Sequence, residues 1–234
     1  ANITNDNGFK YTVKNNGNAL VKFNNPEYAL DVVSDKNGKA YKKPIFSNSS
    51  SISAVGAPDL PSRTTFIAVD PSKSYSLQVS YGSSRIIENI DIAPKGDWNE
   101  LGSDQIISES DYLNIESFYP ANIALLSEPM AMRELSLVSL TVSPFRYFPQ
   151  EKRLEEFMDI EVELIETGNR ESINFFPNKR SRAFEPLYES LVENYSSLNR
   201  EIIPYQRPSI LYVLPNNIGN LLGTVEVLMD WKRR

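Results

Sequence analysis

Short segments in which apolar and polar residues alternate follow one another through about the first 165 residues, and they constrain the fold more than any other feature. The segments have the length of β-strands and are separated by turn sequences rich in Gly, Asn, Pro and Ser. They include FKYTVKN, ALVKFN, YALDVVS, AYKKPIF, TTFIAVD, SYSLQVSYG and RIIENIDIA. Many short, evenly spaced strands are typical of an antiparallel β-sandwich. We therefore expect a mainly β fold up to about residue 167.

Two turn sequences predict particular strand pairs within this region. DKNGK joins YALDVVS to AYKKPIF, and its Asn37-Gly38 dipeptide supplies the positive φ angles that a tight hairpin turn needs. PQEKR lies between the strand-like runs LSLVSLTVSPFRYF and EEFMDIEVELIE. Each turn predicts that its two flanking segments pair as antiparallel neighbours.

The pattern changes after Thr167. The spacing of five apolar residues predicts an amphipathic helix over residues 183–195, namely Phe184, Leu187, Tyr188, Leu191 and Val192. A polar, proline-bracketed stretch follows and predicts an exposed junction over residues 196–208. Residues 209–234 then contain a strand-like run, Ile210–Leu214, and a helix-like run from Leu221. This order is typical of the beginning of an α/β domain, here an incomplete one.

Composition excludes several classes of function. The chain has 24 Lys and Arg against 30 Asp and Glu, a net charge of -6, so we expect no nucleic-acid partner. It also lacks the roughly 18 consecutive apolar residues that would predict a membrane span. The sequence contains no Cys and no His, which excludes Cys-His and Ser-His catalysis and His-ligated or Cys-ligated zinc. We therefore assign no catalytic residue and no metal ligand within the chain.

Five sequence blocks, in order, identify a family. They are GAPDLP at 56–61, IDIAPKG at 90–96, FYPANIALLSEP at 118–129, LTVSPFRYFPQEKRLEEFMDIEVEL at 140–164 and FEPLYESLVENY at 184–195. Together they resemble the N-terminal prodomain of the gingipain-type cysteine peptidases of the caspase-like clan, over roughly residues 20–234. The resemblance implies a curved antiparallel β-sandwich prodomain over residues 1–200. It also implies that residues 209–234 are the first strand and helix of the catalytic domain.

The function implied by this resemblance is that of a propeptide. The prodomain would occupy the active-site cleft of its cognate catalytic domain, keep the peptidase latent, assist its folding and be removed by proteolysis. The chain would be the N-terminal part of a cysteine endopeptidase zymogen whose catalytic Cys and His lie downstream. No cofactor is expected here, and calcium is expected only in the downstream catalytic domain. The resemblance further implies a bacterial protein in the periplasm, at the cell surface or secreted, whose signal peptide has been removed.

The segment between IDIAP and FYPAN is the candidate inhibitory loop, because it is longer than a usual connection between strands. The resemblance places the pocket-filling position of this loop close to Asn99, within the stretch Trp98, Asn99, Glu100 and Leu101. Members of the family that are specific for Arg or Lys carry a matching basic residue in this loop. Here none occurs between Lys95 and Arg133. Either the cognate peptidase prefers another residue or the loop blocks the cleft without mimicking a substrate, and we favour the second interpretation.

The processing site is expected between the predicted helix and the strand that opens the catalytic domain. The resemblance makes Arg200-Glu201 the scissile bond, with Arg182 and Arg207 as reserves. Basic residues in exposed linkers are frequent sites of proteolysis, which agrees with this assignment.

Two other classes of function remain open from the residues alone. The chain could be a stand-alone β-sandwich module for binding or adhesion, or a regulatory subunit without catalysis. A binding module would not need the strand-helix unit at Ile210–Arg234, so this unit favours the propeptide.

Overall fold

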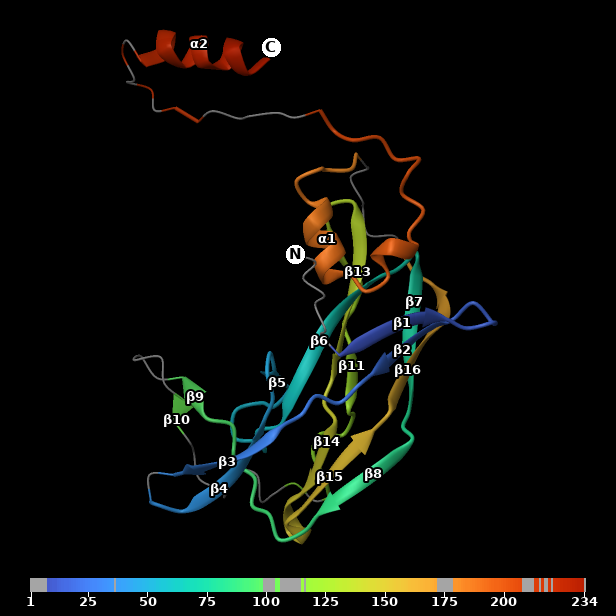
Figure 1. Ribbon diagram of the computed structural model, residues 1–234, viewed down its shortest axis with the longest axis vertical. Helices are drawn as coiled ribbons and strands as arrows, with labels where there is room; N and C mark the ends of the chain where they lie inside the picture. The colour runs from blue at the N-terminus through green and yellow to red at the C-terminus, as the bar shows by residue number, and fades with distance from the viewer. Residues whose placement is uncertain are drawn as a thin grey trace. The chain divides into compact units, whose positions relative to one another are not determined.

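The computed structural model describes residues 8–35, 37–98, 104–105, 115, 117–171, 179–207, 213–214, 216, 219 and 221–233 (Figure 1). The chain divides into two units, Ala1–Pro204 and Tyr205–Arg234. The strands of the first unit are β1 (Phe9–Val13), β2 (Ala19–Phe23), β3 (Ala29–Ser34), β4 (Ala40–Ile45), β5 (Ser50–Ser51), β6 (Pro61–Ala68), β7 (Lys73–Ser80), β8 (Ser83–Ile87), β9 (Asp97–Trp98), β10 (Asp104–Gln105), β11 (Ala124–Leu126), β12 (Met130–Met132), β13 (Leu135–Val142), β14 (Phe145–Phe148), β15 (Arg153–Met158) and β16 (Ile160–Asn169). Its helical segments are η2 (Pro149–Glu151), α1 (Glu185–Leu191) and η3 (Tyr195–Ser197).

Two antiparallel sheets form the main sandwich. One has the strand order β1-β2-β16-β7 and the other β11-β13-β6-β5, with β12 added to β13. Alternate residues of β16 point inward, so Val162 is fully buried, whereas Glu163 and Glu161 on the outer face pair with Lys14 and Lys22. The predicted mainly β, antiparallel fold is confirmed. The first core cluster fills the space between the sheets and consists of Phe9, Val21, Phe23, Ile67, Ile123, Ala124, Val138, Leu140, Val142, Phe157, Ile160, Val162 and Leu164.

Three long strands bend at the same level and pass from this sandwich into a second sheet, β14-β15-β8. The bends separate β7 from β8 at residues 81–82, β13 from β14 at residues 143–144, and β15 from β16 at Asp159. They are neighbours, because Gly82 N donates to Met158 O at 3.0 Å and Phe157 N donates to Pro144 O at 2.8 Å. We call them the aligned bends.

A second core cluster lies beneath the β14-β15-β8 sheet and the β3-β4 hairpin. Tyr147 is fully buried there, and its hydroxyl donates a 3.0 Å hydrogen bond to Ile90 O. Burying a phenol is favourable only when its polar end finds such a partner. The cluster consists of Phe46, Leu60, Ile90, Ile92, Phe145, Tyr147 and Leu154.

Helix α1 covers the outer face of β13 and is shorter than the predicted 183–195 helix. It ends because Val192 leaves the helix and forms a bridge with Phe66 of β6, while Glu193 N donates to Phe66 O at 2.9 Å. The side chain of Asn194 then bonds both the N–H and the carbonyl of Ala68. The apolar residues of this third cluster therefore follow a helical face only up to Leu191.

The second unit contains the helix α2 (Leu221–Arg233). Its apolar side chains are largely exposed, including Leu221, Val227 and Trp231. The helix expected from Leu221 is therefore present, whereas most of the expected Ile210–Leu214 strand lies outside the described residues. No helix of the described chain is long and apolar enough to cross a membrane.

Candidate inhibitory loop and processing junction

The candidate loop begins on a segment that is held by backbone hydrogen bonds to two neighbours. Ala93 N donates to Lys42 O of β4 at 2.9 Å. On the other side, Asp59 N donates to Ala93 O and Lys95 N donates to Ala57 O, each at 2.7 Å. Because Ile92, Ala93 and Pro94 are also buried, this stem is fixed in the body of the domain up to Lys95.

The chain beyond the loop is fixed as well. Tyr119 and Tyr147 exchange two backbone hydrogen bonds, of 2.8 and 2.7 Å. The hydroxyl of Tyr119 also accepts a 3.3 Å hydrogen bond from Ala54 N, and Ile115 packs against the second core cluster. Both ends of the candidate loop are thus attached to the same small core.

The loop residues themselves are described only in part. Asp97 and Trp98 form β9, which pairs antiparallel with Asp104 and Gln105 of β10. Three of the predicted cleft-filling residues, Asn99, Glu100 and Leu101, lie outside the described residues. The described part of the loop is therefore a narrow two-stranded ribbon that continues from the fixed stem.

The processing junction differs from the predicted exposed segment at its key residue. Glu201 is exposed, but Arg200 retains only 6% of its accessible surface. The prediction of an exposed junction is wrong for Arg200, because its side chain folds back onto the domain. The two reserve residues, Arg182 and Arg207, are both exposed.

Arg200 is held by oxygen atoms from two separate parts of the chain. Its Nη2 donates to Oε1 of Glu134 at 2.7 Å, and its Nη1 donates to the hydroxyl of Tyr195 at 2.5 Å. Its guanidinium carbon lies 5.4 Å from the ring centre of Tyr188 and 5.2 Å from that of Tyr195. A planar guanidinium suits both kinds of contact, hydrogen bonding at its edge and stacking on its face.

Arg180 holds the backbone on both sides of the predicted scissile bond. Its Nη1 donates to Arg200 O at 3.2 Å, and its backbone N–H donates to Pro204 O at 3.0 Å. Between these points Ile203 N donates to Arg200 O at 3.0 Å, which closes a turn over Glu201. Residues 200–203 therefore form a hydrogen-bonded turn and not an extended strand.

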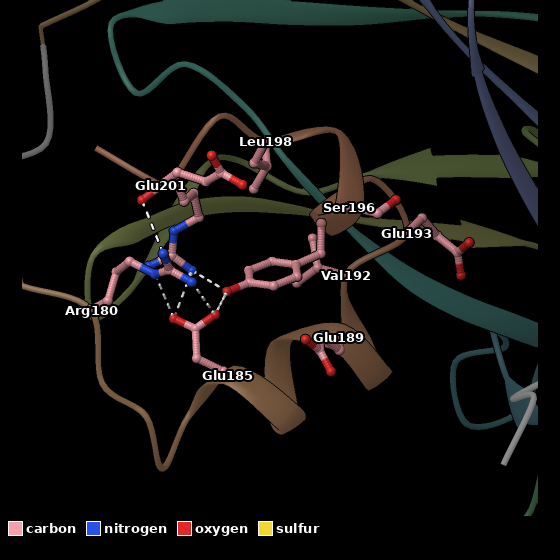
Figure 2. Close-up of a pocket in the computed structure, with 10 residues that line it drawn as sticks. Arg180, Glu185, Glu189, Val192, Glu193, Ser196, Leu198 and Glu201 are labelled. Atoms are coloured by element: carbon pink, nitrogen blue, oxygen red, sulfur yellow. Dashed lines mark hydrogen bonds and ion pairs between the residues drawn. The ribbon is translucent and has the colours of Figure 1, made fainter. Parts of the chain in front are cut away.

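Glu185 joins the two arginines into one network. Its carboxylate accepts hydrogen bonds from Arg180 at 2.9 and 3.1 Å and one from the hydroxyl of Tyr195 (Figure 2). The pKa of the Glu185 carboxyl is lowered, first by the hydrogen bond from Arg180 and then by that from Tyr195. Burial raises the pKa of Tyr188 and of Tyr195 to about 12, so both phenols stay protonated. We call Glu134, Arg180, Glu185, Tyr188, Tyr195 and Arg200 the Arg200 cluster.

A cavity of about 390 Å³ opens beside the Arg200 cluster. Figure 2 shows Arg180 and Glu185 facing each other in it, with Glu189 and Glu193 on other parts of the wall. Sequence reasoning missed Glu134, Arg180, Glu185 and Tyr195 as residues of this site. No motif joins them, because Glu134 precedes Arg200 by 66 residues.

No group of three potential metal ligands occurs among the residues that the structure describes. The candidate sites are a loop on a fixed stem and a buried arginine at a junction.

Comparison with known proteins identifies the family. Residues 12–202 match the family Propeptide_C25, so the chain belongs to the propeptides of the gingipain-type peptidases. Gingipain R2 of Porphyromonas gingivalis is 29% identical over 199 residues, which are 82% of this chain and 26% of that protein. Gingipain R1 of the same organism is 25% identical over 199 residues, which are 82% of this chain and 19% of that protein. The chain thus spans about a quarter or less of the length of these relatives.

Solved structures give the same result. The complex of the Porphyromonas gingivalis RgpB pro- and mature domains contains a chain that is similar to this one, with a TM-score of 0.61 and 25% identity. The similarity covers 82% of this chain and 98% of that chain. A structure on the zymogenic latency of gingipain K from Porphyromonas gingivalis has a TM-score of 0.56 and 17% identity, over 68% of this chain and 93% of that one. The second likeness concerns the fold alone.

Proposed function

We propose that this propeptide keeps a gingipain-type cysteine peptidase latent by placing the loop around Trp98–Leu101 in the active-site cleft. It also assists the folding of the catalytic domain, to which residues 209–234 contribute the first strand and helix. Family membership supports this proposal, as does the relative whose pro- and mature domains form a complex. The peptidase activity itself belongs to the part of the protein beyond Arg234.

The observation that carries the proposal is the fixed stem of the loop. An inhibitor that must enter a cleft loses less conformational entropy on binding when its flanks are already ordered. Ala93 and Tyr119 are each tied to the body of the domain by backbone hydrogen bonds, one before and one after the loop. This arrangement presents the ribbon at residues 97–98 and 104–105 from a rigid base.

The loop acts by blocking the cleft and not by imitating a basic substrate. No Lys or Arg occurs between Lys95 and Arg133, so the loop offers no cation to a pocket that selects arginine or lysine. A chain that fills a cleft without a side chain in the specificity pocket is also cut less readily.

The test is deletion of Asp97–Gly102 from the 234-residue chain, which is then added to the mature peptidase. We expect the inhibition constant to rise by about tenfold or more, the loss of roughly 1.4 kcal/mol of binding. A chain with a Gly/Ser loop of the original length is the matched control for the length of the connection. The melting temperature of each variant reports whether the sandwich is intact. Unchanged inhibition by the folded deletion variant would exclude this loop.

We further propose that the propeptide is removed by cleavage of Arg200-Glu201, which lies a few residues before the end of the first unit at Pro204. The turn over Glu201 must open and the side chain of Arg200 must leave its cluster before a protease can bind the bond. N-terminal sequencing of the mature enzyme tests the assignment and should begin at Glu201. A mature enzyme that begins at Ala183 or Pro208 would move the site to Arg182 or Arg207.

Membership in this family also supports export, and we propose a periplasmic, surface or secreted location. Fractionation of the producing bacterium with an antiserum against residues 8–171 tests it. Propeptide found only in the cytoplasm would refute this location.

A further inference from the structure

The buried position of Arg200 is not explained by its role as a cleavage site. A protease that cuts after arginine needs the side chain in its own pocket, yet this side chain lies within the propeptide. The side chain of Arg200 keeps only 7% of its accessible surface, and that of its partner Glu134 keeps 6%. Burying an ion pair so completely is costly unless its geometry and further hydrogen bonds compensate. Here Tyr195 and Tyr188 supply them.

The charged groups around Arg200 form a connected network in the uncut chain. Glu134 lies 3.4 Å from Nε of Arg133 as well as 2.7 Å from Arg200, and Glu185 pairs with Arg180. Nη1 of Arg200 also lies 3.9 Å from Oε1 of Glu185, so the guanidinium of Arg200 lies between two carboxylates. The guanidinium of Arg180 already points at the carbonyl oxygen of Arg200, 3.2 Å away.

From this geometry we propose that the Arg200 cluster is a binding site for the C-terminal arginine that processing creates. The proposal rests on cleavage at Arg200-Glu201. In that step water adds to the carbonyl carbon of Arg200, the bond to Glu201 N breaks, and Arg200 ends in a carboxylate. Glu201 leaves with the new amino terminus. The new negative charge forms at the atom that Arg180 already contacts.

Cleavage strengthens the binding of Arg200 by the cluster. The hydrogen bond from Ile203 to Arg200 O is lost, but the contact with Arg180 changes from a neutral acceptor to a carboxylate. Hydrogen bonds between two charged groups are shorter and roughly twice as strong as neutral ones. The guanidinium stays bonded to Glu134 and Tyr195 while Arg180 binds the new carboxylate. The site therefore binds both the side chain and the carboxy terminus of Arg200.

The consequence is that the freed propeptide does not offer its C-terminal arginine to other proteins. An arginine carboxy terminus is the product that an arginine-cutting peptidase leaves in its own cleft. When Arg200 is bound in the cluster, it is inaccessible to that cleft and to carboxypeptidases. In the uncut chain the same contacts slow the cut, because the guanidinium cannot occupy the cluster and a protease pocket at once.

The experiment uses the 234-residue chain, cut briefly with trypsin as the probe, and then treated with carboxypeptidase B, which removes C-terminal arginine. Intact mass identifies the fragment that ends at Arg200 and follows its loss of one arginine. Glu134→Gln removes the charge that holds the guanidinium, and Tyr195→Phe removes only one hydroxyl. Glu189→Gln is the matched control, because Glu189 lines the same cavity but takes no part in the ion pairs among the described residues.

We expect the wild-type fragment and the E189Q fragment to lose arginine about tenfold more slowly than the E134Q fragment, with Y195F between them. A second outcome is that trypsin cuts after Arg200 in E134Q but not in the wild type. That result supports the site too, because it means that the cluster keeps the Arg200 side chain from the trypsin pocket. Equal release from all four folded proteins would overturn it, as would a failure of trypsin to cut after Arg200 even in E134Q. Melting temperatures show which variants are folded. If E134Q is unfolded, the comparison between Y195F and the wild type tests the proposal instead.

Trypsin sets the cut in this experiment, so its outcome is separate from the choice made by the natural processing enzyme. If the mature enzyme begins at a residue other than Glu201, the processing site is wrong. The carboxypeptidase result then still reports whether the cluster binds a terminal arginine.

Discussion

Arg200 and Glu134 form an ion pair of 2.7 Å between the segment that follows η3 and the turn that precedes β13. Helix α1 (Glu185–Leu191) lies between these two residues in the sequence, so the ion pair links the chain before the helix to the chain after it. Tyr188 of α1 adds a hydrogen bond to the other oxygen of Glu134, at 3.2 Å. This buried carboxylate therefore adds to the contacts of Val192, Glu193 and Asn194 with β6, which attach the same segment to the sandwich.

Glu134→Gln should destabilise the propeptide substantially. The substitution removes the nearest counter-charge of the buried Arg200 guanidinium and leaves it only Glu185 Oε1, 3.9 Å away. The loss of one partner of a buried pair costs about 3–5 kcal/mol. Urea unfolding followed by circular dichroism measures the change in the free energy of unfolding. Glu189→Gln on exposed α1 surface should alter it by less than about 0.5 kcal/mol. A loss in E134Q as small as that would mean that the pair is not formed.

Acid should remove a contribution of Glu163 to stability. The hydrogen bond from Lys14, followed by those from Asn18 and Asn16, lowers the pKa of the Glu163 carboxyl from 4.5 to about 2. Because the folded pKa is depressed, this contribution is complete above pH 4.5 and is lost as the pH falls toward 2. The melting temperature of Glu163→Gln should therefore vary less over this range than that of the wild type. Parallel curves for the two proteins would contradict the assignment.

Alkali should destabilise the Arg200 cluster through its two tyrosines. Burial raises the pKa of Tyr188 and Tyr195 from 10 to about 12. A group with a raised folded pKa contributes fully below its unfolded pKa, and this contribution is lost as the pH rises from 10 toward 12. Tyr195→Phe should reduce the fall in melting temperature between pH 10 and 12. The exposed Tyr81→Phe is the control and should leave this fall as it is in the wild type.

Gly82 should tolerate a side chain poorly, because an added Cβ would lie 3.1 Å from both Cβ and Oδ2 of Asp159. Both residues belong to the aligned bends, and Asp159 has a φ of 54°. We expect Gly82→Ala to lower the free energy of unfolding by about 1 kcal/mol, as other overpacking changes do. Asp159→Gly removes the clashing atoms and suits the positive φ. The alanine should then cost less in the D159G background, and equal costs in the two backgrounds would show that the contact is not the cause.

Local sequence patterns predicted the elements whose cause is itself local. The Asn37-Gly38 turn and its flanking alternation correspond to the β3-β4 hairpin. Of the two residues expected to have positive φ, only Gly38 has one among the described residues, at 82°. PQEKR likewise joins β14 to β15, with Phe148 opposite Arg153. In both hairpins the turn residues determine the register, so neighbouring residues are sufficient to predict the pair.

Features that depend on distant residues were missed. Each long strand-like run at the PQEKR turn is in fact two strands, divided at residues 143–144 and at Asp159. Pro144 is a signal for the first division, because proline disturbs a strand ladder. Nothing around Asp159 marks the second. Arg200 was expected to be exposed because its neighbours in the chain are polar, and only the fold brings Glu134 to it.

The aligned bends have a mechanical consequence. The loop stem rests on the second core cluster, and β7–β8, β13–β14 and β15–β16 each continue from that end of the domain into the main sandwich. The stem is bonded to β4 through Ala93 and Lys42, and the hydroxyl of Tyr147 binds Ile90 O, so a force on the stem passes first into this second core and from there to all three strands. If the loop occupies a cleft as proposed, its withdrawal would therefore be coupled to movement of the sandwich.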